Sequence, residues 1–312
     1  TLTTGDAGND TISGVISGDG AIVKVGAGSL TFAGANTYSG ATTVSAGTLV
    51  VAHDSGLGSS AAGVTVASGA TLDLQGVYVV SESLTLAGGT LKDLSSSWSG
   101  NVLLTADSSF DVGSSDTLSI SGVISDGGNG YGFTKTGAGE LALSGVNTFT
   151  GDLNITAGEL SVSGSLADSV DLSNSGTYTV SSSDTIQSLS GAGNVVIDSG
   201  FTLTTGDSGD YAISGVISGA GALDKQGTGT LYLMAANTFT GGTTVGQGTL
   251  GLYNNTAAGT GAIDLAGTTE LLLGRQVTAL ANDISLSGSA TIDIDTAIDY
   301  LVVGGGGGGG NG

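Results

Sequence analysis

Three stretches of this 312-residue chain are copies of one another. Residues 26–51 read GAGSLTFAGANTYSGATTVSAGTLVV, residues 137–162 read GAGELALSGVNTFTGDLNITAGELSV, and residues 227–252 read GTGTLYLMAANTFTGGTTVGQGTLGL. Each copy carries short runs of alternating apolar and small or polar residues, separated by glycine and by an Asn-Thr-aromatic triplet. Alternation with a period of two is typical of strands, so the stretches predict repeated β-structure.

The repeats have a large and a small period. The hexapeptide ISGVIS begins at Ile12, Ile120 and Ile213, so the large period is 108 residues (120 − 12) and then 93 (213 − 120). Inside a copy, a leucine returns after 19 residues, as Leu30 and Leu49 do. This recurrence is too short for a βα unit and lacks helical spacing, but it matches one coil of a β-solenoid with parallel strands. Dividing 312 by 19 gives about 16 coils.

Composition supports a folded, glycine-punctuated β-chain. The sequence contains 59 glycines, no proline, 39% hydrophobic residues and 10% charged residues. This balance argues against disorder, and the missing proline and absent strict glycine period exclude collagen. No apolar run approaches the roughly 20 residues of a membrane helix. Proline would remove donors from central strands, so its absence fits the solenoid.

Charge and cysteine content restrict the partners. There are 27 acidic residues against 5 basic ones, a formal net charge of −22. Such a surface repels nucleic acid and anionic lipid and attracts cations or basic partners. The chain has no cysteine, which suits a protein exported unfolded through an envelope. Because the sequence starts at Thr1 without an initiator Met or signal peptide, we expect a processed form or a fragment whose anchor lies elsewhere.

The repeat also resembles a known family. The run G-[AT]-G-x-L, followed by N-T-[YF]-[ST]-G and G-x-L, is similar to the autotransporter-associated β-strand repeat of type V secretion passengers. The resemblance covers about half of the chain, and residues 52–119 and 257–300 share only its general texture. It implies a single-stranded, right-handed parallel β-helix at the bacterial cell surface or outside the cell, commonly in adhesins and self-associating proteins.

We therefore predict an all-β chain with one continuous β-helix over residues 1–303. Its modules are expected at about residues 1–105, 106–200 and 201–303. Residues 304–312 form a glycine-rich terminal segment.

The basic residues leave two interpretations open. Lys24, Lys135 and Lys225 occupy the same repeat position, two residues before a corner glycine. They could contact a ligand, or they could make a repeated structural contact to a neighbouring acid or carbonyl group. His53, the only histidine, is expected at the surface beside Asp54, so no multi-histidine metal site is predicted.

Aromatic residues are few and are placed by the repeat. One corner holds Tyr38, Phe149 or Phe239, with Asn36, Asn147 or Asn237 two residues earlier. We expect corner packing from the rings and a turn hydrogen bond from each asparagine. Trp98, in SSSWSG, has polar neighbours. It is either an exposed ligand contact or a cap over an apolar patch.

Two groups of acids are candidate sites. GDAGNDTIS at residues 5–13 resembles a calcium-binding nonapeptide, with Asp6 and Asp10 as candidate ligands, although such sites need successive turns. Asp293, Asp295 and Asp299 alternate with isoleucines, either as a solvated edge strand or as a carboxylate pair for glycoside hydrolysis. No other metal, cofactor or catalytic residue is predicted.

The leading hypothesis is a non-enzymatic, extracellular rod that mediates adhesion, cell–cell association or biofilm formation. Its partners would be like molecules or a surface ligand, and not nucleic acid. The alternative is a subunit of a filament of end-to-end stacked β-helices, with Gly304–Gly312 packed at the junction between open strand edges. A polysaccharide-acting enzyme is a minor alternative.

Overall fold

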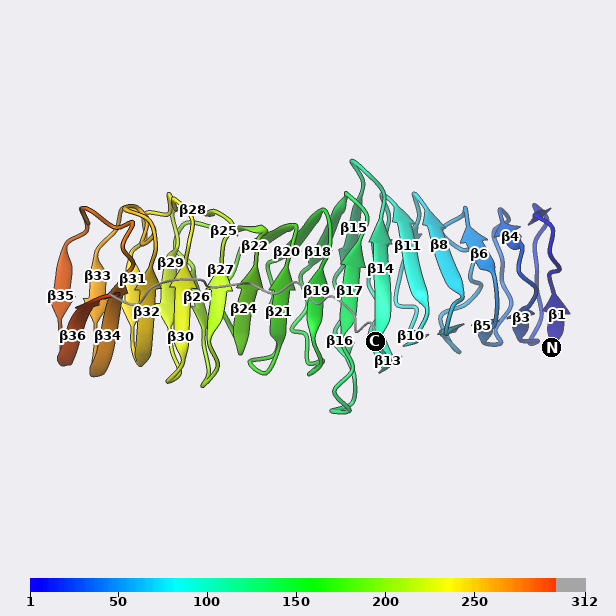
Figure 1. Ribbon diagram of the computed structural model, residues 1–312. Coiled ribbons are helices and arrows are strands. Elements are labelled where there is room, and N and C mark those ends of the chain that lie inside the picture. Colours follow the sequence, from blue (N-terminus) through cyan, green and yellow to red (C-terminus); the bar gives the residue numbers. More distant parts are fainter. Residues whose placement is uncertain (296–312) are drawn as a thin grey trace, which may run out of the picture.

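The computed structural model describes residues 1–295, and these form an elongated β-solenoid without a helix (Figure 1). The strands pair in parallel, each with its counterpart one coil away. The chain in this part therefore has no helix long and apolar enough to span a membrane. The predicted all-β, parallel β-helical fold class is confirmed.

The strands form three faces, which we call A, B and C. Face A contains two sheets that follow each other along the rod. The first comprises β1 (Leu2–Thr4), β3 (Ile22–Lys24), β5 (Thr42–Val44), β7 (Val64–Ala67), β10 (Leu84–Ala87), β13 (Val102–Ala106) and β16 (Ile124–Ser125). The second comprises β23 (Asp184–Ile186), β26 (Thr202–Thr205), β29 (Ala222–Lys225), β31 (Thr243–Val245), β33 (Ile263–Leu265) and β35 (Ile284–Leu286).

Face B is one sheet of 15 strands that extends through all the described coils. It comprises β2 (Asp10–Ile12), β4 (Ser29–Phe32), β6 (Thr48–Val51), β8 (Thr71–Gln75), β11 (Thr90–Leu94), β14 (Ser108–Val112), β17 (Phe133–Thr136), β19 (Leu153–Ile155), β21 (Asp171–Asn174), β24 (Ser188–Gly191), β27 (Tyr211–Ile213), β30 (Thr230–Leu233), β32 (Gly248–Leu252), β34 (Thr268–Leu273) and β36 (Ser289–Ile294).

Face C is an 8-stranded sheet in the middle of the rod. It comprises β9 (Tyr78–Val79), β12 (Ser97–Trp98), β15 (Thr117–Ile120), β18 (Glu140–Leu143), β20 (Glu159–Val162), β22 (Thr177–Val180), β25 (Asn194–Ile197) and β28 (Ile217–Gly219).

The core consists of apolar rows that run along the rod. Leu30, Leu49, Leu72, Leu91 and Phe110 pair in register through five consecutive coils and are buried. Neighbouring parallel strands lie about 4.8 Å apart, so each side chain in a row packs directly on the next. The alternation seen in the sequence therefore becomes one continuous, narrow hydrophobic interior.

The corner glycine is required by close backbone approach. Gly26, Gly137 and Gly227 have φ values of +74°, +73° and +71°. A Cβ on Gly26 would meet the carbonyl oxygen of Asp6 in the preceding coil. L-residues rarely adopt this backbone region, and the coil contact adds a steric reason for glycine in all three copies.

The middle repeat is rotated around the rod relative to the other two. In the first copy, the lysine strand is β3 on face A and the next strand is β4 on face B. In the third copy these strands are β29 and β30, again on faces A and B. In the second copy they are β17 on face B and β18 on face C. Residues of the middle copy therefore lie on the next face of the solenoid compared with their sequence equivalents in the other two copies: on face B instead of A, and on face C instead of B.

The solenoid is continuous through the described residues, with 15 coils counted on face B. The last residues of the expected third module and the glycine-rich segment 304–312 lie outside the described residues. The proposed junction role of Gly304–Gly312 therefore stays a prediction.

Candidate binding groove

The three repeat lysines bind the backbone of their own corners. Lys135 is fully buried, and its Nζ donates to the carbonyl oxygens of Thr136, Gly137 and Ala157 at 2.7, 2.9 and 3.3 Å. Lys24 and Lys225 make equivalent contacts in their copies. Burial lowers the pKa of Lys135 to about 8, against the opposing effect of Asp111, so the ammonium group remains charged at neutral pH. Of the two interpretations, the structure supports the structural one, with carbonyl rather than carboxylate acceptors.

The repeated asparagines connect neighbouring coils. Asn36 accepts the backbone N–H of Ile16 through Oδ1 at 2.8 Å and donates to the Gly56 carbonyl through Nδ2 at 2.7 Å. Asn147 and Asn237 also join the coil before to the coil after. Each asparagine therefore spans three coils, which is more than the turn hydrogen bond expected from sequence.

The aromatic residues of the same corner fill the interior. Tyr38, Phe149 and Phe239 are buried. The Tyr38 hydroxyl lies 2.6 Å from Thr42 Oγ1, and burial raises the pKa of Tyr38 to about 12. The predicted packing of these rings at the corner is confirmed.

Of the two interpretations of Trp98, the exposed ligand contact is wrong. Trp98 is fully buried on β12 and pairs with Val79 and Ile120 in a core row, while Ser97 points outward. The polar residues around it left both interpretations open: Ser95 and Ser99 are exposed and Ser97 lies on the outer face, whereas Ser96 is buried and its Oγ accepts the Val77 N–H. Its Nε1 is buried without a hydrogen-bond partner.

The structure places the calcium candidates in an exposed turn. Asp6 Oδ1 accepts the backbone N–H of Gly8 at 2.6 Å, and Asp10 is exposed at the start of β2. Within residues 1–295, no group of three or more His, Cys, Asp or Glu side chains is arranged to hold a metal ion. Calcium binding by Asp6 and Asp10 stays a prediction. His53 Nδ1 accepts the backbone N–H of Ser55 at 3.0 Å.

The acidic pair near the end of the described chain lies on the last coil. Asp293 is exposed on β36, and Asp295 Oδ2 accepts the Tyr253 hydroxyl at 2.9 Å. Asp299 lies outside the described residues. Neither Asp293 nor Asp295 lines any of the hollows described below.

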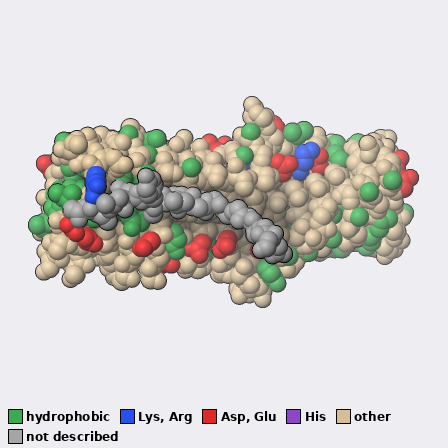
Figure 2. All heavy atoms as spheres, in the orientation of Figure 1, with side chains coloured by type: hydrophobic (Ala, Val, Ile, Leu, Met, Phe, Trp, Pro, Cys, Tyr) green, Lys and Arg blue, Asp and Glu red, His purple; other side chains and the backbone are tan. Residues whose placement is uncertain are grey.

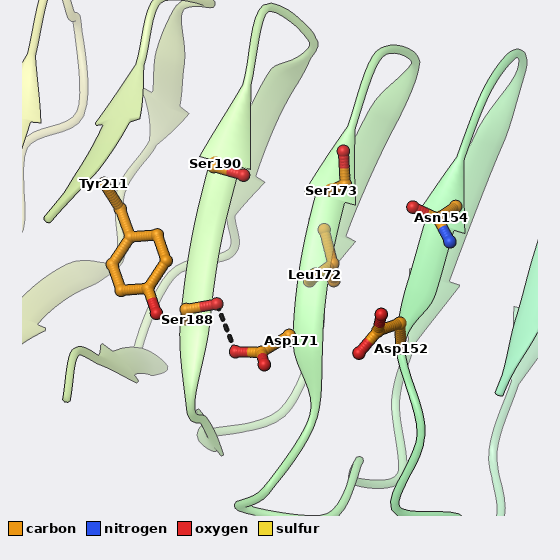
Figure 3. A pocket seen from close by; sticks show the side chains of 8 residues that line it. All are labelled: Asp152, Asn154, Asp171, Leu172, Ser173, Ser188, Ser190 and Tyr211. Carbon is orange, nitrogen blue, oxygen red and sulfur yellow. Dashed lines mark hydrogen bonds between the residues drawn. The ribbon is translucent and has the colours of Figure 1, made fainter. Parts of the chain in front are cut away.

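A groove on face B is one of the concave features of the described residues. One hollow of about 230 Å³ is lined by Asp152, Asn154, Asp171, Leu172, Ser173, Ser188, Ser190 and Tyr211 (Figure 3). A second, of about 650 Å³, shares Ser173, Ser190 and Tyr211 with the first and adds Gly191, Ala192, Asp210, Ala212, Ser214, Tyr232 and Met234. Because the two hollows share three residues, we treat them as one groove that crosses β19, β21, β24, β27 and β30.

Polar side chains recur along this groove in register. Asn154, Ser173 and Ser190 pair through three consecutive coils. Asp171 pairs with Ser188, whose hydroxyl donates a short hydrogen bond to the Asp171 carboxylate (Figure 3). The groove therefore offers similar hydrogen-bonding groups at each coil, with a repeat of about 4.8 Å.

Two tyrosines from consecutive coils line the larger hollow. Tyr211 is half-buried, and its hydroxyl donates to Asp207 Oδ2 at 3.3 Å. Tyr232 lies one coil further, and its ring packs edge-on against Tyr253, with centroids 5.8 Å apart and planes at 68°. Burial, with smaller effects from the carboxylates of Asp207 and Asp171, raises the pKa of Tyr211, so its hydroxyl keeps its proton.

The groove is acidic and contains no basic side chain. Asp152, Asp171 and Asp210 line it, whereas none of the five lysines and arginines does. Figure 2 shows several acidic side chains along the face drawn and basic side chains at two separate places on it. Uncompensated carboxylates in a concavity attract positive charge.

The sequence reasoning missed this groove, although a signal was present. Tyr211, Tyr232 and Tyr253 are spaced by 21 residues, close to one coil, so they had to lie in consecutive turns. The repeat alignment hid them because it compared copies about 100 residues apart and not neighbouring coils.

Comparison with known proteins identifies the repeat. A family model described as Passenger-associated-transport-repeat matches residues 22–51, 133–162 and 223–252. Three stretches of the chain are therefore similar to the passenger-associated transport repeat. The matched ranges contain the lysine, asparagine and aromatic corners described above, so the predicted resemblance to autotransporter passengers is confirmed.

Two curated relatives agree with this assignment. The chain is 33% identical over 210 residues, 60% of its length, to the "Adhesin BmaC autotransporter" of Brucella suis biovar 1 (strain 1330). It is 54% identical over 46 residues, 15% of its length, to the "Extracellular serine protease" of Serratia marcescens. These alignments span 6% of the adhesin and 4% of the protease. No solved structure matches the chain.

The passenger repeats and both relatives indicate a secreted or cell-surface protein. The repeats themselves are structural, because their buried lysine, asparagine and aromatic side chains all contact the protein's own corners.

Proposed function

We propose that this chain is part of a non-enzymatic, extracellular β-helical passenger that mediates adhesion, cell–cell association or biofilm formation. The observation that carries the proposal is the 33% identity to an adhesin autotransporter over 60% of the chain. The rigid solenoid supports it, since a rod of parallel coils holds its outer faces at a fixed distance from an anchor.

The test is gain of adhesion. The chain would be displayed on a non-adherent bacterium through a heterologous anchor, beside the same anchor carrying an unrelated β-solenoid. We expect more aggregation or more attachment to glass, host cells or biofilm matrix than with the control. Equal behaviour of the two strains on all these surfaces would contradict the proposal.

The enzymatic alternative is weaker. The alignment to the extracellular serine protease covers 46 residues, and the three repeat matches contain structural corners. Turnover of a glycan or peptide by purified protein would favour an enzyme. For the polysaccharide-acting enzyme, turnover should be abolished by Asp293→Asn or Asp295→Asn.

A second candidate function, the end-to-end filament, is favoured by the last described coil. Four residues there continue the core rows but are exposed: Ile284, Leu286, Ile292 and Ile294. Another copy of the chain stacked on this coil would cover them. Negative-stain imaging of the purified protein would contradict this candidate if it showed only single short rods at high concentration.

A further inference from the structure

We infer that the groove on face B binds an extended polysaccharide whose sugars carry free amino groups. This inference rests on the proposed adhesive function and names the ligand class. It follows from three features of the groove, namely its aromatic rings, its charge and its periodic polar groups.

The aromatic rings suit the faces of sugar rings. Tyr211 and Tyr232 line a hollow of about 650 Å³ together with the side chain of Met234. The C–H groups on one face of a pyranose are apolar and pack on aromatic rings, while its hydroxyls need hydrogen-bond partners at the edges. Tyr253 packs against Tyr232 and fixes the position of that ring before a ligand arrives.

The charge of the groove selects among sugars. Asp171 accepts hydrogen bonds from the neutral side chains of Gln187 and Ser188, so its negative charge is not neutralised by a cation. Asp152 and Asp210 add charge of the same sign. Uronic and sialic acids would be repelled, whereas a protonated amino group would form a charge-assisted hydrogen bond.

The periodicity of the groove favours a long ligand over a compact one. Asn154, Ser173 and Ser190 repeat at each coil. On β30, Tyr232 pairs with Ala212 of β27 and continues this outer row, while Tyr211 lines the groove from the neighbouring position on β27. The coil spacing is close to the length of one sugar unit in an extended chain. Successive sugars of one polymer therefore meet successive coils of the rod.

Charge also argues against a second copy of this chain as the occupant. The chain carries a formal net charge of −22, so a second copy would bring further negative charge to an already acidic groove. A basic peptide would satisfy the charge but would leave the tyrosines and the periodic serines without a matching surface. The peptide is an outcome that the experiment must separate.

The experiment measures binding of three hexamers to the purified chain by calorimetry: glucosamine hexamer, N-acetylglucosamine hexamer and hexalysine. The two sugars share one backbone and differ in charge. We expect the glucosamine hexamer to bind at least about tenfold more tightly than either of the others. Similar affinity for the acetylated sugar would overturn the role of charge, and similar affinity for hexalysine would overturn the choice of a glycan.

Variants locate the site. Tyr232→Ser and Asp171→Asn are each expected to weaken glucosamine-hexamer binding by about tenfold. Tyr78→Ser and Asp264→Asn are the matched controls, because Tyr78 is exposed on face C and Asp264 lies on face A. Both controls should bind like the unmodified chain. Unchanged binding by the groove variants, or no sugar binding at all, would overturn the inference.

The result is separable from the adhesion test. A rod that promotes attachment but ignores the glucosamine hexamer retains the proposed function and loses the inferred ligand. A rod that binds the hexamer through Tyr232 but confers no attachment retains the ligand and loses the function.

Discussion

Acidification from pH 7.5 to pH 5 should stabilise this very acidic chain, because burial raises the pKa values of two of its buried carboxyl groups, Asp184 and Glu82, into this range. Asp184 is 6% exposed and pairs in a core row with Leu203. Burial raises the pKa of Asp184 to about 6, although the Leu166 N–H and the Tyr178 hydroxyl donate to it. Glu82 is 4% exposed, and burial raises its pKa to about 7.

The sign follows from proton linkage. Both folded pKa values lie above the ordinary values of 3.8 and 4.5, so the folded chain holds protons that the unfolded chain has released. Their contribution to stability is complete below about pH 4 and is lost as the pH rises through 6 and 7. Between pH 5 and 7.5 the loss is about 1 to 2 kcal/mol for Asp184 and about 2 to 3 kcal/mol for Glu82.

Urea unfolding followed by circular dichroism at the two pH values measures the effect. The difference in unfolding free energy between the two pH values should fall by about 1 to 2 kcal/mol in Asp184→Asn and by about 2 to 3 kcal/mol in Glu82→Gln. In the double variant it should fall by about 4 kcal/mol. The reasoning is refuted if the unmodified chain is equally stable at both pH values. It is also refuted if the double variant keeps the full difference.

Three further predictions concern single polar side chains. Lys225→Met should lower the unfolding free energy by about 2–4 kcal/mol, because it leaves buried carbonyl oxygens unpaired. Lys92→Met should cost less, because solvent reaches the Lys92 ammonium group in its ion pair with Asp73; urea unfolding compares the two variants. Asp126→Asn should make the loop after β16 more sensitive to limited proteolysis, since the Asp126 carboxylate accepts the N–H groups of Gly128, Gly130 and Tyr131; equal cleavage would contradict this. Asp93→Asn should raise the unfolding free energy at pH 7.5 by about 1 kcal/mol in the same assay, because it removes a buried charge whose pKa burial raises while its amide oxygen still accepts the Ser96 N–H; a loss of stability would contradict it.

The sequence was sufficient to predict the parallel coils, but it did not predict which residues share a face of the solenoid. Spacings of about 19 residues and the apolar pairs, such as Leu30 with Phe32, determine parallel coils because only that stacking buries both residues in each strand. The sequence left two interpretations of Trp98 open because its neighbours in sequence are serines, whereas its neighbours in space are Val79 and Ile120 in adjacent coils. Which residues share a face depends on the exact length of every turn, and composition does not contain that information.

The rotation of the middle repeat gives the groove its composition. If the chain between successive copies of the repeat always made a whole number of coils, the lysine strands of all three copies would lie on one face. The outer surface of that face would then be similar at each copy. The second copy instead turns one face further, so face B passes from its lysine strand β17 through β19 to strands of the intervening segment and on to β30 of the third copy. Asp171, Ser188 and Tyr211 come from that intervening segment, between the matched ranges 133–162 and 223–252. The repeats therefore supply the buried corners that keep the coils in register and two groove residues, Asn154 and Tyr232. The intervening segment adds the carboxylate of Asp171 and the ring of Tyr211, which give the groove its acidic and aromatic character.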